Sequence, residues 1–177
     1  MSFAGTSAPL ICSLHFDFVD GLVHDAAVAS VRSYFESYTG SWFETLANVT
    51  RPHTITAGDL VAVTALSVTV PTDATIRLLS AEGQRQVSEL LCALPLNQGL
   101  WEVKPELVTD RDGPMWRLHS LLKSSTCRWP ADGSANGIGG VTAGKLIAAK
   151  RPALFPIYDS QVSAALGYPD DGTYWAR

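Results

Sequence analysis

The chain has 177 residues, a formal net charge of −4, and 46% hydrophobic residues against 17% charged ones. This length and composition predict one folded domain, with at most a small extension, and exclude an intrinsically disordered chain. The acidic balance argues against a generic nucleic-acid coat protein. A locally basic face is still compatible with this charge, because binding follows the local potential.

The three cysteines, Cys12, Cys92 and Cys127, lie far apart and form no Cys-x-x-Cys pair. This pattern indicates reduced thiols rather than a disulfide framework, and there is no four-cysteine cluster for an iron–sulfur centre. The first residues do not have the charged and apolar segments of a signal peptide. No apolar run approaches the roughly 20 residues of a membrane span. We therefore expect a cytoplasmic protein that does not enter the membrane.

Helical periodicity dominates the chain and predicts an all-α fold. Residues 10–19 alternate like a short strand or an extended arm, so we expect an arm over 1–20 and one helical domain over 21–177. Helices are predicted over residues 22–37, 41–46, 60–68, 71–79, 82–94 and 115–123. Loops are predicted over residues 95–105 and 124–136.

A capping-box spacing marks the start of the most apolar helix. Thr56 and Asp59 are three residues apart, immediately before the apolar segment 60–68. That segment is apolar almost all round, which predicts a central, buried helix.

The stretch 137–162 is the only segment that suggests a chemistry. Gly137, Gly139 and Gly140 predict a tight turn, and a helix over 141–150 follows it. Glycines let a phosphate backbone approach closely, and the free amides at a helix amino end bind phosphate. The side chains expected to reach phosphates on the open side of this helix are Thr142, Lys145, Lys150 and Arg151.

A single aspartate ends this stretch. Asp159 lies 20 residues after Gly139, behind an extended apolar segment, and is predicted to begin the helix 160–166. The alternative is purely structural. The glycines then form a plain helix-to-helix turn, the basic residues form a solvated face, and Asp159 caps its helix.

The stretch GIGGVTAGKLIAAKRPALFPIYDSQV resembles the helix-hairpin-helix segment of the DNA glycosylase superfamily. The resemblance implies a DNA-binding protein that extrudes a base. Asp159 would be the catalytic carboxylate, stabilising positive charge on the sugar as the glycosidic bond breaks. Bifunctional members carry a nucleophilic lysine where this chain has Val141, and Lys145 lies one turn further on. The resemblance therefore implies at most a monofunctional hydrolase, with no cofactor.

A longer resemblance is to a family of unknown function that is common in actinobacteria. It is carried by Trp42-Phe43, residues 56–68, Leu100-Trp101 and residues 140–162. It implies no known activity. Its members continue beyond the position of residue 177, and residues 172–177 look like the start of a further helix.

Two other functions stay open. The chain is then a non-catalytic helical module that binds DNA or a protein partner, or an enzyme that acts on a small nucleoside-like metabolite. Tyr158, Trp101 and Trp42 are the aromatic candidates for lining a pocket beside Asp159. No metal site is expected, because the four histidines do not have ligand spacing.

Overall fold

The computed structural model describes residues 20–47, 50–123 and 138–166. These residues form nine α-helices and one 3-10 helix, with no strand among them, which confirms the all-α class. The chain divides into two compact units, residues 1–38 and 39–177. Residues 1–19 of the predicted arm 1–20, the predicted loop 124–136 and the end 172–177 lie outside the described residues.

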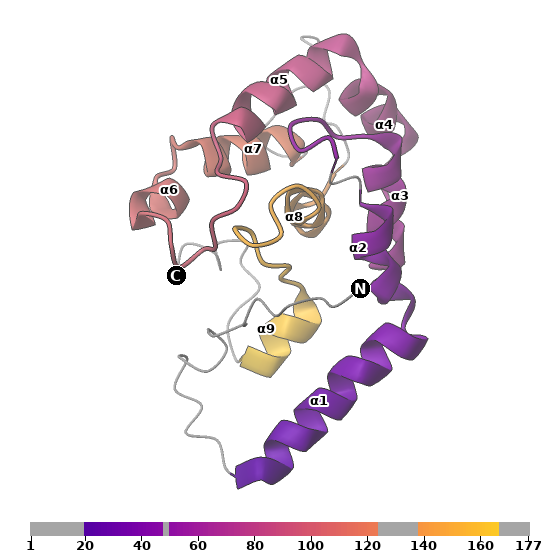
Figure 1. Cartoon of the computed structure of the whole chain (residues 1–177). Helices are drawn as coiled ribbons and strands as arrows, with labels where there is room; N and C mark the ends of the chain where they lie inside the picture. The colour runs from indigo at the N-terminus through magenta and orange to yellow at the C-terminus, as the bar shows by residue number, and fades with distance from the viewer. Residues whose placement is uncertain (1–19, 48–49, 124–137, 167–177) are drawn as a thin grey trace. The chain divides into compact units, whose positions relative to one another are not determined.

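The first unit contains one long helix, α1 (Asp20–Ser37), drawn in indigo in Figure 1. It confirms the helix predicted over 22–37. In its last turn the Ser37 hydroxyl donates to the Ser33 carbonyl at 2.8 Å. Val28 and Phe35 are exposed, so this helix shows apolar side chains to solvent.

The second unit contains the remaining described helices. They are η1 (Thr39–Ser41), α2 (Trp42–Leu46), α3 (Ala57–Ala65), α4 (Thr72–Leu79), α5 (Ala81–Cys92), α6 (Pro105–Thr109), α7 (Pro114–Leu122), α8 (Gly140–Ala148) and α9 (Ser160–Leu166). Apart from η1 and α6, each of them corresponds to a predicted helix. The short helix α6 begins at a proline, whose fixed φ and missing amide suit a first turn. The Trp116 Nε1–H group anchors it by donating to the Val108 carbonyl at 2.9 Å.

Helix α3 confirms the capping box but ends earlier than predicted. The Thr56 amide donates to Asp59 Oδ2 at 2.6 Å, and the Asp59 amide donates to Thr56 Oγ1 at 3.4 Å. The helix ends at Ala65 instead of residue 68. The reason is local backbone geometry, because Ser67 has a left-handed φ of 59°, which an α-helix cannot include. The helix is also not buried all round, since Val61 is 53% exposed.

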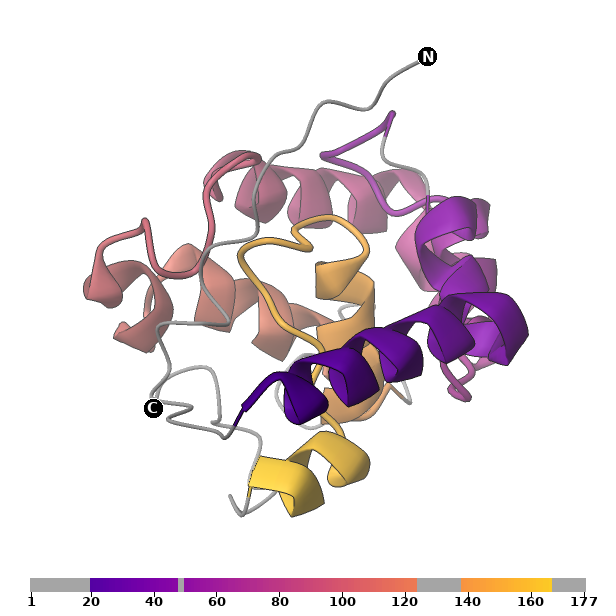
Figure 2. The same cartoon turned by 60° about the horizontal axis from the view of Figure 1, so that its bottom comes forward.

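Helix α8 lies inside the second unit, where it contacts α3 and α7 (Figure 1). Every residue from Ala143 to Ala148 is buried. Figure 2 shows the same central position from a second direction. Small residues such as Ala143 and Gly144 let neighbouring helices approach closely. The helix of the predicted hairpin is therefore the core helix of this unit.

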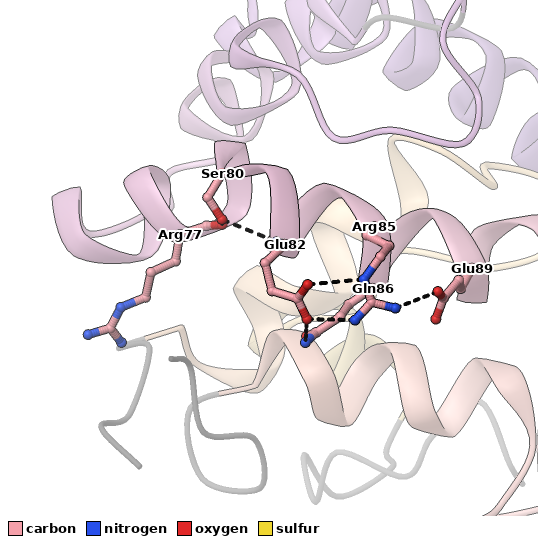
Figure 3. Close-up of polar contacts among 7 residues, drawn as sticks. Arg77, Ser80, Glu82, Arg85, Gln86 and Glu89 are labelled. Atoms are coloured by element: carbon pink, nitrogen blue, oxygen red, sulfur yellow. Dashed lines mark hydrogen bonds and ion pairs between the residues drawn. The ribbon is translucent and has the colours of Figure 1, made fainter. Parts of the chain in front are cut away.

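Helix α5 carries a ladder of charged side chains on its outer face, shown in Figure 3. Arg85 bonds Glu82 and Glu89, each at 2.7 Å, across one helical turn in either direction. These bonds raise the pKa of Arg85 and lower that of Glu82. At the start of the helix, Ser80 Oγ accepts the Gly83 amide at 3.1 Å. The charged side chains of Glu82, Arg85 and Glu89 on this outer face are therefore paired with one another.

Candidate functional site

The amino end of α8 is partly open to solvent. Gly139 is the residue before the helix and is exposed, and a side chain built on it would meet nothing within 4 Å. Gly140 and Thr142 are half-buried in the first turn. Gly137 lies outside the described residues. Two of the three predicted glycines therefore stand at a helix start that a ligand can approach.

Lys123 lies beside this helix start, although nothing in the sequence pointed to it. A Cβ on Gly140 would lie 3.8 Å from Lys123 Cε and 3.8 Å from His119 Cε1. Lys123 follows α7 and is half-buried. It is separated from Gly140 by 17 positions and a predicted loop, so no short-range spacing connects the two residues.

His119 contacts the same turn from inside. Its Nε2 lies 3.3 Å from the Gly140 carbonyl, which requires the hydrogen on Nε2. Its ring stacks on Phe155, with centroids 6.4 Å apart. Burial lowers the pKa of His119, and the nearby Lys123 charge acts in the same direction. His119 is therefore a neutral group of the core at neutral pH.

Lys150 is buried and paired. Its Nζ lies 2.5 Å from Asp59 Oδ2, and the two side chains are 1% and 0% exposed. Burial lowers the pKa of Lys150, and the Asp59 carboxylate partly opposes that effect. The ammonium group therefore faces the core and not the outer side of α8.

Arg151 is fully buried and serves as a cross-link between segments. Burial lowers the pKa of its guanidinium. Its guanidinium also contacts His53 Nδ1 at 3.3 Å. It donates to main-chain carbonyls of three segments. These are Pro52 in the loop before α3, at 2.7 Å, and Leu91 and Leu94 at the end of α5, the latter at 3.3 Å. The third is Lys150, which follows α8, at 2.8 Å.

Lys145 is the third buried cation of the motif. Its Nζ donates to the Leu66 carbonyl at 2.8 Å and lies 3.6 Å from Asp159 Oδ2. From the glycine turn and the helix that follows it we expected Lys145, Lys150 and Arg151 on an open side of that helix. In the structure all three are at most 5% exposed, and they join α8 to its neighbours.

Asp159 is held at both carboxylate oxygens and is still partly exposed. Its Oδ1 accepts the Val162 amide at 3.2 Å, which confirms the predicted cap of α9. Its Oδ2 faces the Lys145 ammonium, and 30% of the side chain is exposed. The result is a fixed carboxylate at the surface, backed by a buried positive charge.

The three aromatic candidates are not brought together. Tyr158 is buried at 6% exposure, next to Asp159 in the chain. Trp101 and Trp42 are 58% and 60% exposed. Helix α2, which begins with Trp42, and the segment before α6 lie on opposite sides of the second unit (Figures 1 and 2). These two tryptophans therefore do not line one pocket.

Two further properties concern the part of the chain that the structure describes. No group of three or more histidine, cysteine, aspartate or glutamate side chains is placed to hold a metal ion there. Within the same residues, none of the helices has the length and apolar character needed to cross a bilayer.

The fold and the site define an all-α protein in which helix α8 is buried. The basic residues Lys145, Lys150 and Arg151 on and after this helix are buried as well. The chain belongs to DUF6308, a family of unknown function, which it matches over residues 27–177. This confirms membership of a family of unknown function. No curated protein and no solved structure matches the chain significantly.

Proposed function

We propose that this chain is a DNA-directed protein of the helix-hairpin-helix type, a monofunctional base glycosylase in which Asp159 is the catalytic carboxylate. The observation that carries the proposal is the partial exposure and fixed orientation of the Asp159 carboxylate. The side chain is partly exposed, and its two oxygens are oriented by the Val162 amide and the Lys145 ammonium. A preorganised carboxylate of this kind stabilises positive charge that develops on a substrate.

The chemistry follows from that charge. Breaking the bond between the sugar C1′ and the base nitrogen sends the electron pair to the base and leaves oxocarbenium character on the sugar. Asp159 faces this positive charge, water adds to C1′, and the proton released from water balances the departing base. Val141 offers no amine for a covalent intermediate, so hydrolysis is the expected outcome.

A phosphate of the DNA backbone would bind at the amino end of α8. The exposed Gly139 permits a close approach, and the helix dipole favours an anion there. Lys123 supplies a cation next to Gly140. The buried Lys145, Lys150 and Arg151 take no part in this contact and instead hold α8 in place.

The test is base release from labelled duplexes that carry a damaged or mismatched base. We expect release by the native chain, and loss of release with retained DNA binding in Asp159→Asn. Asp73→Asn, an exposed aspartate in the first turn of α4, is the matched control and should behave like the native chain. Equal activity of Asp159→Asn would remove Asp159 from the mechanism.

A second candidate is a non-catalytic helical module that binds DNA through the same end of α8. The observation that favours it is that both carboxylate oxygens of Asp159 are engaged by groups of the chain itself, as in a purely structural helix cap. Salt-dependent binding without base release supports this module. No binding to any duplex at low salt overturns both candidates.

A further inference from the structure

A groove of about 810 Å³ lies between the end of α5, the segment 95–104 and α6. Its apolar lining includes Leu94, which is buried, and Leu107 and Val103, which are half-buried. Its charged lining residues are Glu102, Glu106, Asp110 and Lys104, that is, three carboxylates and one ammonium group. The groove therefore combines an apolar floor with an acidic rim.

Hydrogen bonds fix the walls of this groove. Glu102 Oε2 accepts the Gly99 amide at 2.6 Å, which closes the turn before α6. The Gly113 amide donates to the Asp110 carbonyl at 3.0 Å, which closes the turn after it. The Glu102 carboxylate thus has a structural bond, as does that of Asp110, whose Oδ1 accepts the Asp112 amide at 2.9 Å. Glu106 lies exposed on the first turn of α6. The acidic rim is already formed without a ligand.

We propose that this groove docks a basic segment of a protein partner, with arginine or lysine side chains between apolar ones. The argument is charge complementarity together with shape. The long stem of an arginine or lysine packs on apolar surface while its charged head reaches carboxylates. A volume of about 810 Å³ accommodates several side chains of an extended segment. This partner site is separate from the function proposed for Asp159.

The probe is a short capped peptide of alternating leucine and arginine, titrated into the isotope-labelled full chain at low salt. We expect amide resonances of residues 102–110 to shift, and the affinity to fall as salt is added. Glu106→Gln should weaken binding by about threefold, as loss of one exposed charge pair predicts. Glu44→Gln on α2 removes an exposed carboxylate elsewhere and should leave the affinity unchanged.

Three results would overturn the proposal. The first is an unchanged affinity in Glu106→Gln. The second is equal binding of a matched peptide with glutamate in place of arginine. The third is equal binding of free arginine amide, which would assign the groove to a small organic cation instead of a peptide.

Discussion

Lys150 and Asp59 form a buried ion pair in which Lys150 Nζ lies 2.5 Å from Asp59 Oδ2. The same carboxylate oxygen accepts the Thr56 amide at 2.6 Å and the Thr56 hydroxyl at 2.8 Å. One oxygen atom therefore closes the capping box of α3 and receives the charge at the end of α8. The start of one helix and the end of another depend on a single side chain.

Removing the charge of Lys150 should destabilise the fold strongly. Lys150→Met leaves the Asp59 carboxylate buried without its cation, and we expect the free energy of unfolding to fall by about 3–5 kcal/mol. Urea unfolding measures this change. Lys104→Met, an exposed lysine, is the control and should shift the value by less than about 0.5 kcal/mol. Similar values for the two variants would contradict a structural role for the buried pair.

Arg151 should not tolerate a conservative replacement. Arg151→Lys keeps the charge but cannot reach the carbonyl groups of the loop before α3 and of the end of α5 at once, so buried acceptors lose their donors. We expect a loss of about 2 kcal/mol or more in the free energy of unfolding, because each unsatisfied buried group costs roughly 1–3 kcal/mol. The matched change Arg117→Lys, at an exposed position on α7, should be almost neutral. A neutral Arg151→Lys would show that the cross-link is dispensable.

The stability of the chain should fall in mild acid through His119. Burial lowers the pKa of His119 from its ordinary value of 6.5, so below that value the unfolded chain takes up a proton that the native chain refuses. The unfolded state then binds more protons, and stability declines with falling pH until the lowered native pKa is reached. We expect His119→Gln to lose less stability than the native chain between about pH 7.5 and about pH 5.5. Equal pH dependence of the two chains would exclude His119 as the cause.

The proposed DNA binding should depend only weakly on salt concentration. With three of the motif's cations buried, Lys123 is the cation expected to contact a phosphate, and the logarithm of the affinity should change with a slope of about −0.9 against the logarithm of the salt concentration. Lys123→Gln should remove most of that slope. Binding isotherms at several salt concentrations measure it. A slope of about −3 or steeper would mean that the buried cations reach the DNA.

Most helices were predictable from the sequence because their signals are local. The spacing of Thr56 and Asp59 and the position of Asp159 before α9 both rely on bonds between residues three positions apart. One short helix and one helix boundary show where local signals are not sufficient. Helix α6 has only five residues, too few for a periodic pattern, and is anchored by Trp116 from α7. The end of α3 depends on Ser67 and on the Leu66 carbonyl, which Lys145 binds from 79 residues away.

Some features of the candidate site were also predictable from local sequence, and others were not. Composition and local spacing were sufficient to predict an all-α chain, a helix that begins next to Gly139, and an aspartate that caps α9. Only the tertiary structure decided that Lys145, Lys150 and Arg151 face the core, and that Lys123 stands beside Gly140. The physical reason is the distance along the chain between the partners. Arg151 donates to the Pro52 carbonyl across 99 residues, and no helical period or short motif records a contact of that range.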